Sequence, residues 1–302
     1  MAQFPPASVA DLTQQLRDVG YLADRGLATA AFLATTLGRP LLLEGEVGVG
    51  KTELAKTLAA MYGRQLIRLQ CYEGIDTNQA LYEWDYARQM LKVRAMNEHR
   101  AADDESIDHL FSDEFLVERP LLQAIRAGER CVLLIDEVDR ADDEFEAYLL
   151  EVLSEYAITI PELGRFAAAR PPLVVLTSNR TRDVHDALKR RCLYHWVEHP
   201  DFEREVRIVR MRVPQALDRL ARQVAGAVEA LRGLNLYKPP GVAETIDWAQ
   251  ALAAIGVSEL DERSVLATLG TVLKYREDQD RTKAHGIADL VKHAFERGAS
   301  PA

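Results

Sequence analysis

The sequence predicts an α/β fold, with a parallel sheet covered by helices on both faces, followed by a smaller domain made only of helices. Short apolar runs alternate with helical patterns through the first two thirds of the 302 residues. A segment with apolar residues at helical spacing separates the first two runs, which is the pattern of a strand–helix–strand unit. After His199-Pro200 the apolar runs stop, and helical patterns separated by Pro and Gly follow.

Five apolar runs predict the strands of the sheet. Each has about four to six apolar residues bounded by polar ones, which is typical of parallel strands that are buried on both faces. The runs are "PLLLE" (40–44), "QLIRLQ" (65–70), "CVLLIDE" (131–137), "PLVVLTSN" (172–179) and "LYHWVEH" (193–199). Between the first two, Leu54, Leu58 and Met61 recur at helical spacing in "ELAKTLAAM".

Two connections are too long to be simple crossovers and should contain elements of their own. In residues 71–130, the pieces around Tyr86 and Val93 predict a β-hairpin. In residues 138–171, "EFEAYLLEVLSE" predicts an amphipathic helix and "YAITIPELGRFAAARPP" predicts a strand, a Pro/Gly turn and a second strand.

The change of pattern after Pro200 places a domain boundary there. We expect a nucleotide-binding αβα domain over residues 1–200 and a helical domain over residues 201–302. Four segments carry the helical patterns: "FEREVRIVRMRV", "ALDRLARQVAGAVEALRGL", "AETIDWAQALAAIG" and "ERSVLATLGTVLKY". In the first of these, Glu203 and Glu205 alternate with arginines and suggest a solvated helix face.

Composition narrows the function classes. A net charge of −10 argues against a protein whose main task is to grip nucleic acid, because phosphate binding needs a basic surface. Cys71, Cys131 and Cys192 show no CxxC spacing, which favours free thiols in a reducing cytosol. The histidines show no metal-ligand spacing. The N-terminus does not read as a signal peptide, and no apolar run approaches the roughly 18 residues of a membrane helix, so we expect a cytoplasmic protein.

The strongest motif is "GEVGVGKT", which follows the first strand and opens a helix. It fits the phosphate-binding pattern G-x-x-x-x-G-K-[ST] in the required context. Its glycines let backbone N–H groups wrap a phosphate at a helix N-terminus. Lys51 bridges the β- and γ-phosphates of ATP, and the Thr52 hydroxyl ligates Mg²⁺. The candidate phosphate-binding residues are Gly45, Glu46, Val47, Gly48, Val49, Gly50, Lys51 and Thr52.

Two acids end the third predicted strand. "CVLLIDEVDR" carries Asp136 and Glu137 to its carboxyl end, beside the phosphate loop in any such sheet. Asp136 is expected to hold Mg²⁺, and Glu137 to orient and polarise the attacking water. The second acid indicates a hydrolase rather than a kinase for small molecules.

Asn179 and two arginines complete the candidate site. Asn179 ends the fourth predicted strand, where its amide would hold the lytic water. Arg190 and Arg191 precede the fifth strand, where they are far from a nucleotide bound to their own chain. A guanidinium supplied to a neighbouring subunit accelerates hydrolysis by on the order of 10³–10⁵. We assign this role to Arg191, with Arg190 as the alternative or as a partner that orients it.

With these residues in place, the chain resembles the AAA+ ATPases of the MoxR family. The most similar subgroup is CoxD-like, on the stretches "LQCYEGIDTNQALYEWDYARQML", "LTSNRTRDVHDALKRRCLYHW" and "GTVLKYRED". The resemblance runs from about Val19 to the C-terminus. It departs at Asn179-Arg180, where many relatives have Asn-Pro, and at "DERS", where the family's lid has Ser-Pro-Arg.

The resemblance implies a P-loop AAA+ αβα sandwich with a five-stranded sheet, a helical lid and insertion β-hairpins within residues 71–100 and 157–170. It also implies a hexameric ring and a partner with a von Willebrand factor A domain. In the CoxD-like subgroup the client is a molybdenum-containing CO dehydrogenase-type metalloenzyme, which the ATPase helps to mature. ATP and Mg²⁺ are the implied cofactors.

Three assignments keep two interpretations. Arg263 is either the lid's nucleotide-sensing arginine or an arginine on a solvated helix. Tyr21 and Leu22 lie either against adenine or in the core. Tyr82, Trp84 and Tyr86 either face the client or form the packed side of the predicted hairpin.

The sequence therefore predicts a ring-forming, Mg²⁺-dependent ATPase that remodels a protein client. One alternative is an ATP-gated adaptor without productive turnover. The other is a GTP-using DNA restriction or translocation motor, against which the acidic composition counts.

Overall fold

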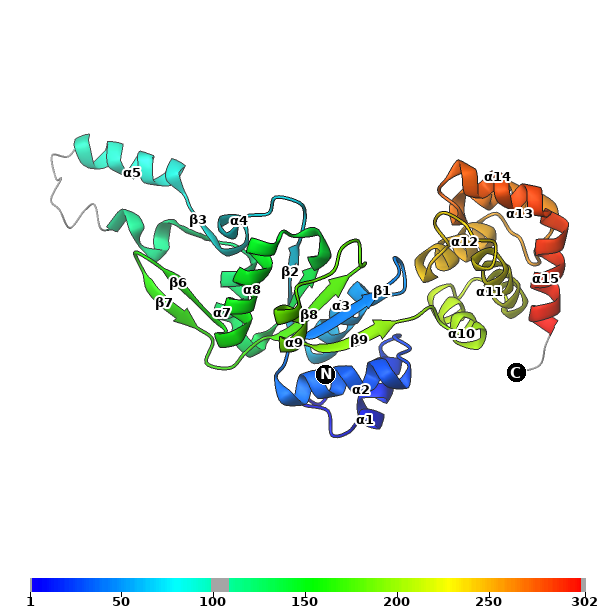
Figure 1. The fold of residues 1–302 in the computed structure, drawn as a ribbon, viewed down its shortest axis with the longest axis horizontal. Coiled ribbons are helices and arrows are strands. Elements are labelled where there is room, and N and C mark those ends of the chain that lie inside the picture. Colours follow the sequence, from blue (N-terminus) through cyan, green and yellow to red (C-terminus); the bar gives the residue numbers. More distant parts are fainter. Residues whose placement is uncertain (1, 99–108, 300–302) are drawn as a thin grey trace. The chain divides into compact units, whose positions relative to one another are not determined.

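The computed structural model describes residues 2–98 and 109–299, and the chain divides into two compact units (Figure 1). The first unit contains most of the chain up to Trp196. The second contains everything from Val197 onward together with two earlier segments, Leu16–Ala23 and Gly45–Lys51. The second segment includes most of the predicted phosphate loop.

A five-stranded parallel sheet forms the core of the fold, and each predicted apolar run supplies one strand. The sheet order is β2-β5-β8-β1-β9. The strands are β1 (Leu41–Gly45), β2 (Gln65–Gln70), β5 (Cys131–Asp136), β8 (Leu173–Ser178) and β9 (Leu193–Val197). Every residue of β1, β5 and β8 is buried, as expected for central parallel strands covered on both faces. The predicted α/β fold is confirmed.

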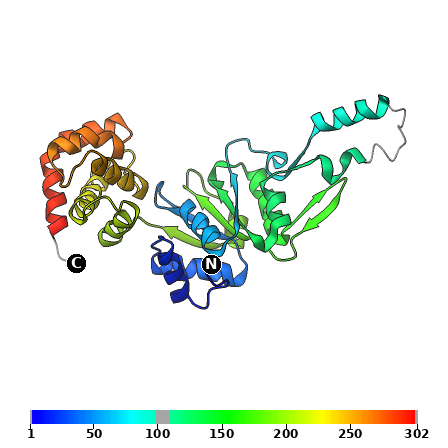
Figure 2. The same ribbon diagram turned by 180° about the vertical axis from the view of Figure 1, so that it is seen from behind.

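Helices cover both faces of this sheet. The helix α3 returns the chain from β1 to the far strand β2, whereas α7, α8 and α9 carry it in the opposite direction across the sheet. Since such crossovers are right-handed, α3 lies on one face and the other three helices lie on the opposite face (Figures 1 and 2). Apart from those within residues 71–119, the helices before β9 are α1 (Val9–Asp18), α2 (Arg25–Leu37), α3 (Lys51–Tyr62), α7 (Pro120–Ala127), α8 (Asp143–Glu155) and α9 (Asp186–Arg191).

The long connection after β2 differs from its prediction. The β-hairpin expected around Tyr86 and Val93 is wrong, because both residues lie on the helix α5 (Tyr86–Glu98). The segment is rich in Ala, Arg, Gln, Met, Leu and Lys, which all favour helix, and Val93 is its one β-branched residue. A short helix, α4 (Thr77–Leu81), precedes β3 (Tyr82–Trp84), which pairs antiparallel with β4 (Leu116–Glu118). The partner strand therefore lies outside the expected range of residues 71–100.

The second insertion agrees with its prediction. The helix α8 is followed by β6 (Ala157–Ile160) and β7 (Gly164–Ala167), which pair antiparallel as a hairpin. Gly164 adopts φ of 84°, a left-handed conformation that favours glycine at the turn.

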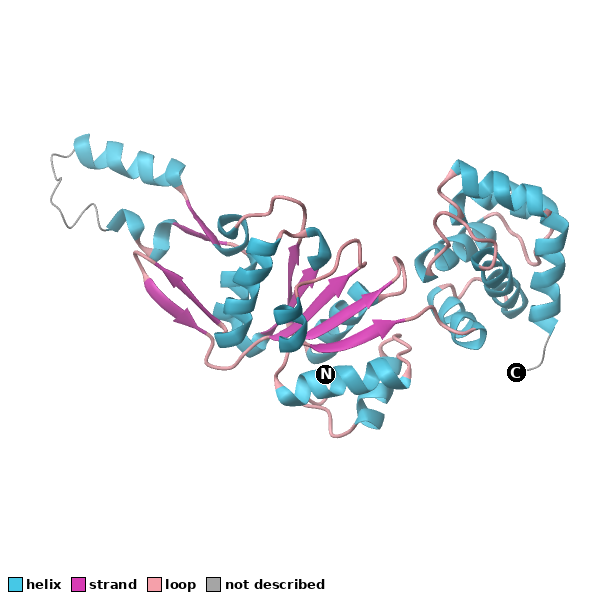
Figure 3. Ribbon diagram, in the orientation of Figure 1, coloured by secondary structure: helices cyan, strands magenta, loops and turns pink. Residues whose placement is uncertain are grey.

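The chain after β9 forms only helices and loops in the part that the structure describes (Figure 3). Trp248 lies at the centre of their core, fully buried, and its indole N–H donates to Thr268 Oγ1 at 2.7 Å. Aspartate side chains cap two of the helices, Asp201 before α10 and Asp261 before α13. The helices are α10 (Phe202–Arg212), α11 (Asp218–Arg232), α12 (Val242–Ala254), α13 (Glu262–Val272), α14 (Arg276–His285) and α15 (Ile287–Ala299).

All three cysteines are buried and none forms a disulfide. Burial raises the pKa of the Cys71 and Cys192 thiols to about 12 and that of Cys131 to about 11. Among the described residues, no helix is both long and apolar enough to cross a membrane.

Candidate active site

The phosphate loop needs its glycines for two different reasons. Gly45 ends β1, and a Cβ there would lie 2.3 Å from the carbonyl oxygen of Val197, so only glycine fits. Gly48 and Gly50 adopt φ of 81° and 95°, which a side chain would strain. The motif predicted from the sequence therefore forms the tight loop that it requires, between β1 and α3.

Two contacts hold this loop within the second unit. Lys51 is 6% exposed, and its ammonium donates hydrogen bonds to the carbonyl oxygens of Gly45 at 2.8 Å and Glu46 at 2.6 Å. The backbone N–H of Val242, the first residue of α12, donates to the carbonyl oxygen of Gly48 at 3.0 Å. The lysine side chain thus lies across the loop, and α12 supports the loop from outside.

A buried ion pair braces α12, and the sequence did not point to it. Glu205 on α10 is 1% exposed and accepts two hydrogen bonds from the Arg232 guanidinium, at 2.6 and 2.8 Å. It also accepts from the hydroxyl of Thr245 on α12 at 2.7 Å, while Arg232 donates to the carbonyl oxygen of Pro240. The expectation of a solvated face at Glu205 is therefore wrong. An Arg partner on the next helix was the missing information, and nothing local indicates it.

Asp136 gathers three side chains at the end of β5. Its Oδ1 accepts from the Thr52 hydroxyl at 2.9 Å and from the Thr177 hydroxyl, and its Oδ2 accepts from the Arg68 guanidinium. The carboxylate is 3% exposed. Thr52 and Asp136, the two predicted Mg²⁺ ligands, are therefore brought together as a pair of hard oxygen donors, which is the ligand type that Mg²⁺ prefers.

Glu137 has an unusual backbone conformation and three polar neighbours. Its φ of 55° lies in the left-handed region, which is uncommon for a residue with a side chain and recurs at functional sites. Its carboxylate accepts from Gln70 Nε2 at 3.0 Å, from the Arg140 guanidinium at 3.0 Å and from Asn179 Nδ2 at 3.4 Å. The structure therefore brings Glu137 and Asn179 together, as the sequence predicted for residues at neighbouring strand ends.

Asp139 is a second buried carboxylate that sequence reasoning missed. It is 1% exposed and accepts from the backbone N–H groups of Asn179 at 3.1 Å and Thr181 at 2.8 Å, and from the Thr181 hydroxyl. It fixes the end of β8 and so the position of Asn179. The spacing "DEVD" placed it near the site, but an acid three residues after a strand is usually exposed.

Arg190 and Arg191 lie near the amino ends of the strands, on the side of the sheet opposite to the carboxylates. Both are exposed in the last turn of α9, and their carbonyl oxygens accept from the Arg39 guanidinium, which precedes β1. They are therefore at the amino ends of β1 and β9, whereas Asp136 and Asn179 are at the carboxyl ends of β5 and β8. The structure does not bring these arginines to the carboxylates of their own chain.

The remaining candidates separate into buried and exposed residues. Tyr21 is 8% exposed and donates from its hydroxyl to the carbonyl oxygen of Gly50, in the phosphate loop, at 3.3 Å. Leu22 is half-buried, and its carbonyl oxygen accepts from Arg204. Arg263 is exposed at the second position of α13. Its role as a nucleotide sensor stays a prediction.

His199 is a further titratable group in the second unit. Burial, and then the positive charges of Arg232 and Lys51, lower its pKa from 6.5 to about 4. Its Nδ1 is buried and has no hydrogen-bond partner among the described residues. A neutral imidazole at this position avoids adding a third positive charge beside Lys51 and Arg232.

A family of known proteins matches the part of the chain that contains this site. Residues 40–192, half of the chain, match the AAA domain of the dynein-related subfamily. The chain belongs to this AAA domain family. The match covers the phosphate loop, both acids at the end of β5, Asn179 and the two arginines of α9.

Similar sequences and structures cover most of the chain. An uncharacterized protein of Staphylococcus haemolyticus is 24% identical over 272 residues, which are 86% of this chain and 94% of that protein. One of Staphylococcus saprophyticus is 23% identical over 80% of this chain and 88% of its own length. A point mutant of RuvB from Thermotoga maritima is a solved structure with a TM-score of 0.49 at 15% identity, covering 97% of this chain and 90% of that chain.

Proposed function

We propose that this chain is a Mg²⁺-dependent ATPase that remodels a protein client as a subunit of a hexameric ring. One observation carries the proposal. Thr52, Asp136, Glu137 and Asn179 come from separate elements or their ends, and hydrogen bonds join them in two pairs, Thr52 with Asp136 and Glu137 with Asn179. Membership of the AAA domain family supports a nucleotide-driven activity for this arrangement.

Each residue has a distinct part in the proposed hydrolysis. Lys51 would contact the β- and γ-phosphates, and Thr52 and Asp136 would hold Mg²⁺. Such an ion would supply positive charge to the phosphate oxygens, where negative charge develops. Glu137 orients the attacking water and accepts its proton, and Asn179 fixes the position of that water.

The contacts of the two acids favour a second candidate, the ATP-gated adaptor. The Asp136 carboxylate is engaged by Arg68, and the Glu137 carboxylate by Arg140 and Gln70. A Glu137 side chain that keeps these partners is not available as a base, and such a chain would bind ATP without turning it over. Hydrolysis requires Glu137 to exchange at least one of these hydrogen bonds for water.

The position of Arg191 supports a ring. An exposed guanidinium at the amino edge of the sheet, without an ion pair among the described residues, is suited to the γ-phosphate of a neighbouring subunit. AAA domain proteins commonly assemble into rings. If Arg191 of one subunit acts on the nucleotide of the next subunit, the ring must form before ATP can be hydrolysed.

The finer family assignment supplies the client. The resemblance to MoxR proteins of the CoxD-like subgroup leads us to propose a von Willebrand factor A domain partner and a CO dehydrogenase-type molybdenum enzyme as client. The rival GTP-using DNA motor differs in its nucleotide. A competition assay separates the two: excess GTP should inhibit ATP hydrolysis if the chain uses GTP and should leave it unchanged if the chain uses ATP.

Phosphate release from Mg-ATP, measured beside the binding of a fluorescent ATP analogue, tests the proposal. Glu137→Gln should bind the analogue normally and lose at least about 100-fold in turnover, because only activation of the water is removed. Lys51→Ala should lose binding. Matched controls are Glu144→Gln, an exposed acid at the start of α8, and Lys56→Ala, an exposed lysine of α3.

The outcomes separate the candidates. Turnover that is absent from the unmodified ring, although ATP binds, would leave the adaptor as the better explanation. Equal loss of nucleotide affinity in Glu137→Gln and Lys51→Ala would show that the role given to Glu137 is wrong.

A further inference from the structure

Every strand of the core sheet is preceded by an arginine. Arg64 comes directly before β2 and Arg130 directly before β5, Arg170 and Arg39 come shortly before β8 and β1, and Arg190 and Arg191 come shortly before β9. In a parallel sheet all of these positions share one edge. Following the sheet order β2-β5-β8-β1-β9, the arginines form a row. Arg191 already has a part in the proposed hydrolysis, so we give the name basic edge to the row before β2, β5, β8 and β1 only.

The basic edge carries little compensating negative charge. Two cavities lie along it, and Glu129 is the one acidic residue that lines either of them in the described part of the chain. Glu129 pairs with Arg170 through both carboxylate oxygens, each 3.1 Å from Nη1. Within the described residues, Arg39 and Arg130 donate instead to backbone carbonyl oxygens, of residues 190–192 and of Arg126 and Ala127 respectively. A chain with net charge −10 thus concentrates positive charge on this edge.

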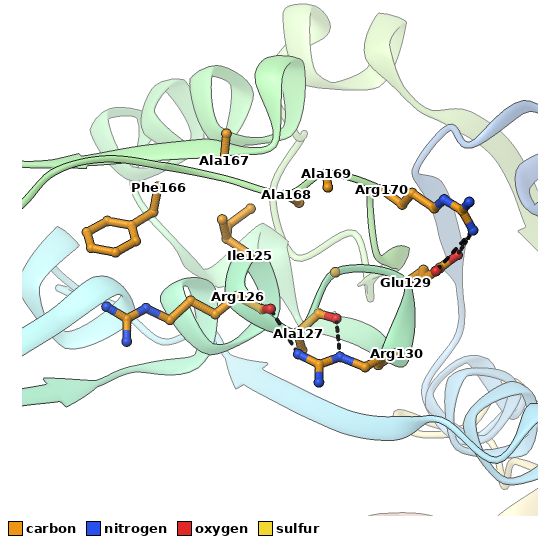
Figure 4. A pocket seen from close by; sticks show the side chains of 11 residues that line it. Ile125, Arg126, Ala127, Glu129, Arg130, Phe166, Ala167, Ala168, Ala169 and Arg170 are labelled. Carbon is orange, nitrogen blue, oxygen red and sulfur yellow. Dashed lines mark hydrogen bonds and ion pairs between the residues drawn. The ribbon is translucent and has the colours of Figure 1, made fainter. Parts of the chain in front are cut away.

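The two cavities have apolar floors between the guanidinium groups. The first, about 410 Å³, lies between the end of α7 and the segment from the end of β7 to Arg170, and Figure 4 shows Ile125, Phe166 and alanine side chains beside Arg126, Arg130 and Arg170. The second, about 340 Å³, is lined by Leu37, Pro171, Leu173 and the side chains of Arg39 and Arg64. Arg170 and Glu129 line both cavities, so the cavities adjoin each other.

We propose that the basic edge binds an extended acidic segment of a partner protein, in which apolar side chains alternate with carboxylates. Four strands at about 4.8 Å spacing give an edge of roughly 14 Å, the length of about four extended residues. Arginines and apolar residues line the same two cavities. The segment can therefore place apolar side chains on the cavity floors while neighbouring carboxylates reach the guanidinium groups at the cavity borders.

The aromatic residues of the edge favour a protein partner over single-stranded nucleic acid. Bases bind such surfaces by stacking on free aromatic faces. Here one face of the Phe166 ring is occupied by the Arg126 guanidinium, 4.5 Å from its centroid, and one face of the Phe4 ring by that of Arg64, at 3.6 Å. These two rings therefore each have one face fewer on which a base could stack.

Fluorescence anisotropy of a fluorescein-labelled peptide that alternates glutamate and valine, titrated with the full-length protein at low salt, tests the proposal. The double variant Arg130→Gln/Arg170→Gln should bind about tenfold more weakly, the sum of two exposed ion pairs. The control Arg207→Gln/Arg276→Gln removes the same charge from helices of the second unit and should bind normally. Arg130→Lys/Arg170→Lys keeps the charge and should restore most of the affinity.

Three results would overturn the proposal. The first is no peptide binding by the unmodified protein, and the second is an equal loss in both glutamine double variants. The third is tighter binding of an oligothymidylate than of the peptide, which would assign the edge to nucleic acid. None depends on ATP hydrolysis, because Arg130 and Arg170 lie at the strand ends opposite to Asp136. Unchanged circular dichroism and thermal unfolding of the variants show that they are folded.

Discussion

At the residue scale, His199 predicts a pH dependence of stability. Its pKa is lowered to about 4 in the folded protein from 6.5, so the unfolded chain binds a proton between these values and the folded chain does not. The free energy of unfolding is therefore unaffected by this group above pH 6.5. It falls by about 1 kcal/mol for each pH unit as the pH decreases from 6.5 toward 4.

Urea denaturation at a series of pH values measures this effect. The free energy of unfolding should fall between pH 6.5 and about 4 in the unmodified protein and fall less in His199→Gln, whose side chain does not titrate. Identical pH profiles for the two proteins would contradict the neutral state of the half-buried His199.

The residues that the sequence predicted, and those that it did not, differ in whether a local pattern marks them. Lys51 and Thr52 are part of a local motif, and Asp136, Glu137 and Asn179 were found because strand ends can be located from apolar runs. Asp139 and Glu205 depend on hydrogen bonds to residues about 27 to 42 positions away, such as Thr181 and Arg232. An isolated acid in a helical or loop pattern is usually solvated, so no local pattern marks these two as buried.

At the scale of elements, the aromatic cluster Tyr82, Trp84 and Tyr86 is divided between the strand β3 and the helix α5, and its members differ in exposure. Trp84 is 7% exposed and packs edge-on against Tyr82 and Phe111, whereas Tyr86 is 64% exposed. The packing interpretation therefore describes Trp84, and a contact with the client stays a proposal for Tyr86.

Paired alanine variants test this division. Trp84→Ala removes a buried indole and should destabilise the protein by about 3–5 kcal/mol. Tyr86→Ala should leave stability and basal ATP hydrolysis unchanged and should reduce the stimulation of hydrolysis by the client. Stimulation that survives in Tyr86→Ala would show that this tyrosine does not contact the client.

The insertions were also the elements hardest to predict. Each core strand is marked by its own apolar run, since burial on both faces requires one. The strand β3 has three residues, and β4, its partner, comes about thirty residues later, so neither carries a readable pattern. The β6–β7 hairpin was predicted correctly because its two strands flank a short turn with Pro161 and Gly164.

At the scale of the whole molecule, the arginines of α9 predict complementation between subunits. Arg191→Ala should bind ATP normally, because its phosphate belongs to the neighbouring subunit, yet hydrolyse ATP slowly even as a formed ring. Lys51→Ala should be inactive because it cannot bind ATP, although it keeps Arg191. Mixed rings contain interfaces that join an intact nucleotide site to an intact Arg191, so mixing two inactive proteins should restore part of the activity.

The ATPase rate of such mixtures, with ring formation followed by light scattering, provides the measurement. A mixture of Arg191→Ala with Arg191→Lys is the control and should gain nothing. If mixed rings form and no activity returns, Arg191 acts within its own chain.

The burial of all three cysteines has a practical consequence for studying these assemblies. Maleimides react with thiolates, and the native thiols are both inaccessible and held in the protonated form. A single cysteine introduced at an exposed position, such as Tyr237 or Leu266, should therefore take up a fluorophore selectively in the native chain. A cysteine-free background is unnecessary, and subunit exchange and nucleotide-driven motion can be followed in otherwise unaltered protein.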